Sequence, residues 1–61
     1  MSKTYVGRFS EQDLSEGRDK VAVEKAMLST GLKYINTKLV KHNGKVVAMD
    51  IWICGVDDFK I

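Results

Sequence analysis

The pair Asn43-Gly44 lies between two runs rich in β-branched and aromatic residues, and it constrains the fold more than any other feature of the chain. A type I′ hairpin turn needs positive φ at both central residues, which Asn and Gly tolerate best. With this pair at the turn, residues 32–54 are predicted to form an antiparallel hairpin in which His42 faces Lys45. If the ladder is uninterrupted, this one pair determines the pairing of all the remaining hairpin residues.

An uninterrupted ladder divides the hairpin side chains between two faces, because side chains alternate along a strand. It pairs Val40 with Val47 and Lys41 with Val46. Residues 46–53 are apolar except at Asp50, which is typical of a strand covered on both faces. We expect the more apolar face to be the core face, with Tyr34, Asn36, Lys38, Val40, Val47, Met49, Ile51 and Ile53. The second face then carries Lys33, Ile35, Thr37, Leu39, Lys41, Val46, Ala48, Asp50, Trp52 and Cys54.

A short strand is predicted for residues 3–9, which contain aromatic and β-branched residues. Simple alternation places Tyr5 and Phe9 on one side of this strand and Arg8 on the other. Gly7 marks a bulge or a close approach of the backbone.

A helical segment follows the first strand. Ser10 is a good N-cap with acidic residues behind it, and Ser15 begins a second candidate start that contains Gly17. Helix is expected over residues 19–29, with Gly31 as a left-handed C-cap. Val23, Ala26, Met27 and Thr30 share one arc of this helix. Val21 and Leu28 share a second arc, which either extends the core edge or contacts another chain.

These elements predict an α+β fold, a single β-α-β-β domain over residues 1–61, with an antiparallel sheet and one helix packed on one face. The tail, residues 55–61, is either a further edge strand or an extension.

A chain of 61 residues has little core, since a domain of this size buries only roughly 60% of its unfolded surface. Small domains therefore usually need an additional source of stability, such as disulfides, a structural metal or association with another chain. Cys54 is the lone cysteine, so an internal disulfide is excluded. Cys54 and His42 together fall short of the ligands of a structural zinc site. Association with another chain is the source of additional stability that remains.

Composition places the protein among ordinary globular chains, with 44% hydrophobic residues, 30% charged residues and a net charge of +2. No apolar run is long enough for a membrane span, and the first residues do not resemble a signal peptide. Together with the lone thiol, this predicts a cytoplasmic protein without membrane contact.

No catalytic or cofactor motif is present, and we expect neither enzymatic activity nor a cofactor or metal. The glycines are too dispersed for a phosphate-binding loop, and the single histidine supports no catalytic triad. The carboxylates between residues 11 and 19 lack the spacing of a metal-binding loop and fit the acidic first turn of a helix.

The leading functional hypothesis is protein binding, as an accessory regulator or inhibitor that also forms homodimers. Such roles are common among small free-standing proteins, including phage-encoded ones, although no residue here shows that origin. The predicted partner-binding surface is the second hairpin face, centred on Trp52 with Ile35, Leu39 and Val46, because one helix can cover only the other face. In the competing interpretation, the first strand or the tail through Phe59 covers Trp52.

The alternative hypothesis is a small nucleic-acid-binding domain that uses the basic hairpin tip. Lys41, His42 and Lys45 gather there, and a basic two-stranded ribbon can follow a phosphate backbone or enter a groove. The competing interpretation is an edge that lysines protect from aggregation.

Overall fold

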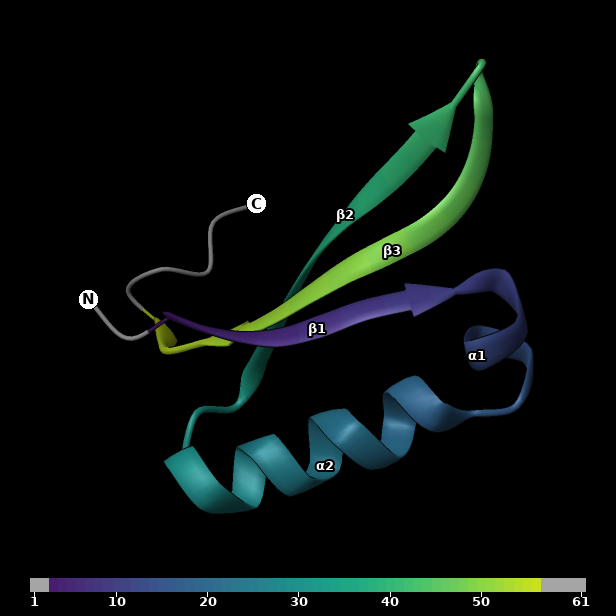
Figure 1. Cartoon of the computed structure of the whole chain (residues 1–61). Coiled ribbons are helices and arrows are strands. Elements are labelled where there is room, and N and C mark those ends of the chain that lie inside the picture. The colour runs from purple at the N-terminus through teal and green to yellow at the C-terminus, as the bar shows by residue number, and fades with distance from the viewer. Residues whose placement is uncertain (1–2, 57–61) are drawn as a thin grey trace.

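The computed structural model describes residues 3–56. Its elements are β1 (Lys3–Ser10), α1 (Glu11–Ser15), α2 (Arg18–Thr30), β2 (Tyr34–His42) and β3 (Lys45–Cys54). In this part of the chain the strands form one antiparallel sheet in the order β1-β3-β2. Both helices lie on the same side of the sheet, with α2 running beneath β1 and β3 (Figure 1). The predicted α+β fold is confirmed, with two helices in place of the single one expected.

The local signals for the helices act as predicted. The Ser10 hydroxyl accepts a hydrogen bond from the Asp13 N–H at 3.2 Å, and the Asp13 carboxylate accepts one from the Ser10 N–H at 3.1 Å. This reciprocal capping box starts α1. Gly17, at φ 76°, separates α1 from α2. Gly31, at φ 78°, ends α2 and donates its N–H to the Met27 carbonyl at 2.8 Å.

The core lies between α2 and the helix-facing side of β3. Its buried centre consists of Val23, Ile51 and Ile53. Partly buried side chains from β1, α2, the α2–β2 connection and β3 surround it: Val6, Phe9, Ala26, Met27, Leu32 and Met49. Residues 46–53 lie in β3, which is central in the sheet and largely buried in its second half. The predicted cover on both faces is not found among the described residues, because both helices lie on the same side of the sheet (Figure 1).

The hairpin turn is as predicted, but the ladder is interrupted two pairs beyond it. Asn43 and Gly44 have φ values of 53° and 76°. His42 pairs with Lys45 and Lys41 with Val46, as expected. The register then shifts, and Val40 pairs with Ala48. The predicted pairing of Val40 with Val47 is therefore wrong, because Val47 is the extra residue of a β-bulge.

The bulge exchanges the two faces of β2 relative to β3. Ile35 now pairs with Ile53 and Leu39 with Met49, so these β2 side chains lie on the helix side. The predicted core face is correct for Met49, Ile51 and Ile53 and wrong for Tyr34 and Val40, which lie on the opposite face with Asn36 and Lys38. The physical gain is clear at Lys38. An uninterrupted ladder would place its charge beside the core, whereas the bulge moves it opposite Asp50.

A second bulge interrupts β1. Tyr5 pairs with Trp52 and Gly7 with Ile51, so Val6 is the extra residue. The prediction of a bulge at Gly7 is confirmed, and the simple alternation predicted for this strand is wrong. Tyr5 and Arg8 share the face away from the helices, while Phe9 packs against the core.

Neither helix among residues 3–56 is long and apolar enough to cross a bilayer. The predicted tail is described only at Gly55 and Val56, so Phe59 and its expected contact lie outside the described residues.

The bulged register can be checked by nuclear Overhauser effects in solution. We expect cross-strand contacts between the backbone protons of Leu39 and Met49, and between those of Thr37 and Ile51, because these residues are directly opposed. An uninterrupted hairpin would instead oppose Lys38 to Met49 and Asn36 to Ile51. Observation of the latter set would contradict the bulge.

Candidate functional site

The four residues predicted to form one partner-binding surface lie in three places. Trp52 lies on the sheet face away from the helices. Ile35 and Leu39 lie on the helix side of β2. Val46 lines a depression of about 660 Å³ shared with α1. The predicted common surface is therefore wrong, because the bulge at Val47 moves β2 by one residue against β3.

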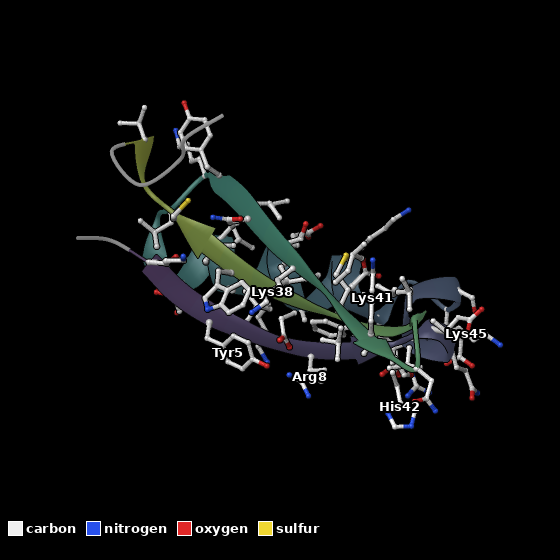
Figure 2. All side chains as sticks on the ribbon, turned by 90° about the horizontal axis from the view of Figure 1, so that it is seen from above. Tyr5, Arg8, Lys38, Lys41, His42 and Lys45 are labelled. Carbon is white, nitrogen blue, oxygen red and sulfur yellow. The ribbon has the colours of Figure 1, made fainter. Side chains whose placement is uncertain are left out.

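We call the sheet face away from the helices the open face. The register and the alternation of side chains assign to it Lys3, Tyr5, Arg8, Ser10, Tyr34, Asn36, Lys38, Val40, Ala48, Asp50, Trp52 and Cys54. Figure 2 looks onto this face and shows Tyr5, Arg8 and Lys38 along it.

Asp50 is the polar centre of the open face. Arg8 holds its carboxylate with two bonds, Nε to Oδ1 at 2.9 Å and Nη2 to Oδ2 at 3.0 Å. The Tyr5 hydroxyl donates to Oδ1 at 3.0 Å. Asp50 is only 7% exposed although no helix covers this face. A carboxylate so shielded needs several donors, and Arg8 and Tyr5 supply them.

These contacts shift the pKa values of the three groups. The hydrogen bond from Arg8 is the main reason why the pKa of Asp50 lies below its ordinary value. The hydrogen bond from Tyr5 and the charge of Lys38 lower this pKa further, whereas desolvation opposes the shift. Desolvation raises the pKa of Tyr5, and its hydrogen bond to Asp50 raises it further. The hydrogen bond to Asp50 also raises the pKa of Arg8.

Aromatic rings lie beside this polar centre. The Tyr5 and Trp52 ring centroids are 5.4 Å apart with an angle of 53° between the planes. The Lys3 Nζ lies 5.4 Å from the centroid of the Trp52 ring, a cation–π arrangement. Tyr5 is 52% exposed and Tyr34, in the neighbouring row across β3, is 38% exposed. The open face therefore presents aromatic and cationic groups together.

The residues predicted for nucleic-acid contact are brought together at the hairpin tip. Lys41, His42 and Lys45 are exposed there (Figure 2), and the tip projects away from α2 (Figure 1). Lys3, Arg8 and Lys38 lie elsewhere on the open face and were not among the predicted contacts. Lys38 was set aside because an uninterrupted ladder placed it on the expected core face.

Charge is divided between the two layers of the fold. The strands carry five lysines and arginines, Lys3, Arg8, Lys38, Lys41 and Lys45, against the single carboxylate of Asp50. Residues 11–30 carry five carboxylates against three basic residues. The sheet layer is therefore basic and the helical layer acidic.

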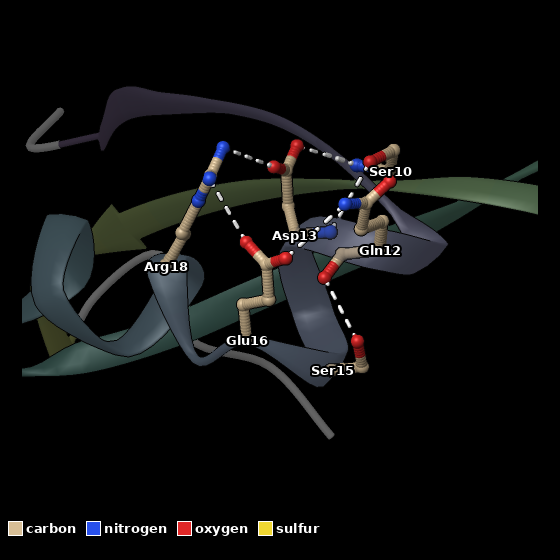
Figure 3. A network of polar contacts seen from close by, with 6 residues as sticks. All are labelled: Ser10, Gln12, Asp13, Ser15, Glu16 and Arg18. Carbon is tan, nitrogen blue, oxygen red and sulfur yellow. Dashed lines mark hydrogen bonds and ion pairs between the residues drawn. The ribbon is translucent and has the colours of Figure 1, made fainter.

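The carboxylates of the helical layer are engaged in local structure. Arg18 bonds Asp13 at 3.2 Å and Glu16 at 2.9 Å, and Gln12 donates to Glu16 at 3.1 Å (Figure 3). Hydrogen bonds from Ser10 hold the pKa of Asp13 below its ordinary value. This network ties α1 to the start of α2. Within residues 3–56, no group of three or more His, Cys, Asp or Glu residues could hold a metal ion.

The helix side of the sheet contains an open apolar groove. Helix α2 packs on β1 and β3 and leaves the helix side of β2 uncovered, with Ile35 44% and Leu39 54% exposed. The resulting space has a volume of about 630 Å³. The apolar side chains that line the groove are Val23, Met27, Leu28, Leu32, Ile35, Met49 and Ile51.

Polar groups line the groove as well, namely Asp19, Lys20, Glu24, Lys33 and Thr37. Asp19 is unusual among them. Within the described residues its Oδ1 atom is buried and has no hydrogen-bond partner.

Comparison with protein-family models, with curated proteins and with solved structures finds no match to this chain.

The contacts of Asp50 predict a particular dependence of stability on pH. Because its pKa is lowered on folding, the stability that it contributes is present above the unfolded value of about 3.9 and is lost as pH falls through the folded pKa. The pKa of Asp13 is also lowered, so the stability that Asp13 contributes is likewise lost as pH falls. We expect Asp50→Asn to be less stable than the wild type at neutral pH and to lose less stability on acidification, as measured by thermal unfolding at a series of pH values.

Asp13→Asn serves as the control, because it removes the other carboxyl whose pKa is lowered, while its amide oxygen can still accept from the Ser10 N–H. Wild-type and Asp50→Asn unfolding curves that change in parallel between neutral and acidic pH would contradict the assigned role of Asp50.

Proposed function

We propose that this chain is a non-catalytic protein-binding module with an accessory or regulatory role, and that it associates with a second copy of itself through the α2–β2 groove. The observation that carries the proposal is that the helical layer leaves β2 uncovered beside an apolar space of about 630 Å³. The proposal keeps the function expected from the sequence and moves it from the Trp52 face to the groove.

The small core supports association. Only Val23, Ala48, Ile51, Ile53 and Cys54 are buried apolar residues among residues 3–56. Leu28 at the edge of the groove is 82% exposed and Ile35 is 44% exposed. Full burial of a leucine side chain contributes about 1.5–3 kcal/mol. A few such contacts are comparable with the whole stability of a small domain.

The polar lining of the groove favours a second copy as the occupant. Both signs of charge are present, with Asp19 and Glu24 on α2 and Lys33 after it. In a two-fold arrangement the same patch faces itself, so a patch with both signs can place a carboxylate of one copy against a lysine of the other.

Leu28→Lys tests the groove, and Val21→Lys is its matched control. Both residues are exposed apolar side chains of α2, at 82% and 71%, but only Leu28 lines the groove. We expect Leu28→Lys to raise the dimer dissociation constant by roughly 150-fold or more, because a two-fold dimer loses the burial of two leucines, about 3–6 kcal/mol. Val21→Lys should leave it unchanged. Sedimentation equilibrium over a range of protein concentrations measures both.

A wild-type chain that stays monomeric at the highest concentrations would overturn self-association. Equal weakening by the two substitutions would show an interface elsewhere on α2. Circular dichroism of each variant confirms that the fold is retained.

A further inference from the structure

We propose that the open face binds single-stranded nucleic acid, with bases stacked on Trp52 and Tyr5 and the phosphate backbone following Lys3, Lys38 and the hairpin tip. The inference concerns the sheet face opposite the groove and does not depend on the association proposed above. It also differs from duplex binding by the tip alone, because the aromatic rings take part.

The first argument is the arrangement of rings and cations. Single strands are bound where aromatic side chains offer stacking platforms beside a positively charged track. Here the Tyr5 and Trp52 rings lie 5.4 Å apart on adjacent strands, and the Lys3 ammonium lies 5.4 Å from the centroid of the Trp52 ring. Other single-strand-binding sheets stack about two or three bases on such side chains.

The second argument is the charge of the face. Asp50 is the lone carboxylate of the described strands, and Arg8 already neutralises it with two hydrogen bonds. The Arg8 side chain is still 60% exposed, and a guanidinium has five N–H donors. Donors therefore remain for a phosphate while the ion pair stays intact. The acidic residues of the helices lie in the other layer.

The third argument concerns the choice between classes of partner. An apolar protein surface on the open face would have to desolvate the Arg8 guanidinium and Lys38. A nucleic-acid backbone instead supplies anions to these cations and leaves much of the site in contact with water. The charge of the face thus favours nucleic acid over a hydrophobic partner.

The rings also favour a single strand over a duplex. Unpaired bases expose their π-faces, whereas the bases of a duplex are stacked on each other. On binding, the Lys3 ammonium leaves the Trp52 ring for a phosphate, and a base takes its place over the ring. The 2′-hydroxyl of RNA is the group that would distinguish RNA from DNA at this site.

Trp52 is the only tryptophan in the sequence, so its fluorescence reports directly on this face. We expect oligothymidylate and oligouridylate of roughly a dozen nucleotides to quench it at low salt. A mixed-sequence duplex of equal length should bind more weakly and quench less. Affinity should fall steeply between about 50 and 200 mM salt. The two single-stranded probes separate DNA from RNA.

Tyr5→Leu and Tyr5→Phe separate stacking from structural support. Both remove the hydroxyl that bonds Asp50, but only Tyr5→Phe keeps a ring. We expect Tyr5→Leu to weaken binding by roughly 5- to 150-fold and Tyr5→Phe to bind nearly as well as the wild type. Thermal unfolding of both variants shows that they are folded at the temperature of the titration.

Lys38→Ala and its control Lys25→Ala test the phosphate track. Lys38 lies on the open face, whereas Lys25 is exposed on α2. The slope of log affinity against log salt should decrease by about 1 for Lys38→Ala and stay unchanged for Lys25→Ala.

Three outcomes would overturn the proposal. The first is the absence of Trp52 quenching by either single strand at low salt. The second is equal weakening by Tyr5→Leu and Tyr5→Phe, which would show that the ring plays no part. The third is tighter binding of the duplex without a change in Trp52 emission, which would place the contact at the tip residues Lys41, His42 and Lys45 alone.

Discussion

A carboxylate in the middle of the central strand is the constraint on which the rest of this structure depends. Asp50 pairs with Arg8 on one side and Lys38 on the other. An unpaired charge at 7% exposure would be costly, so the neighbouring strands must bring donors to it. The bulge at Val6 places Tyr5 and Arg8 on the same face, and the bulge at Val47 turns Lys38 toward that face. Both bulges thus bring hydrogen-bond donors or positive charge to the face on which the Asp50 carboxylate lies.

The same two bulges make the faces of the sheet chemically different. The side toward the helices receives apolar side chains from all three described strands, and those of β2, Ile35 and Leu39, extend beyond the reach of α2. The opposite side receives the cations and the aromatic rings around Asp50. One face is therefore suited to apolar contact and the other to an anionic ligand. A small domain can present two unlike surfaces in this way without a second layer of helices.

Local signals in the sequence were sufficient to predict the fold class. The strand register depends on long-range contacts and was predicted incorrectly. Ser10, Gly31 and the Asn43-Gly44 turn act within a few residues, so each could be recognised from the sequence and each is confirmed. The bulge at Val47 depends on a balance between turn, core and Asp50. An uninterrupted ladder ignores that balance, which is why it assigned Ile35 and Leu39 to the face of Trp52.

Two details of the sequence pointed to the correct register. The unbroken ladder left Asn36 and Lys38 on the expected core face, and it opposed Asp50 to Thr37 instead of to a cation. A one-residue shift removes both conflicts. The position of α2 over β1 and β3, which creates the groove, has no comparable signal, since it depends on the strand order. That order places β3, the last of the three described strands, at the centre.

The strand order also determines when this chain can fold during its synthesis. Strands β1 and β2 make no ladder with each other in the sheet, and each pairs with β3. Until residues 45–54 leave the ribosome, the earlier residues can form helices and a turn but no sheet. Helix α2 then has no apolar sheet face on which to pack. The sheet and the core then form together around β3, so residues 3–42 cannot complete their fold before residues 45–54 are available.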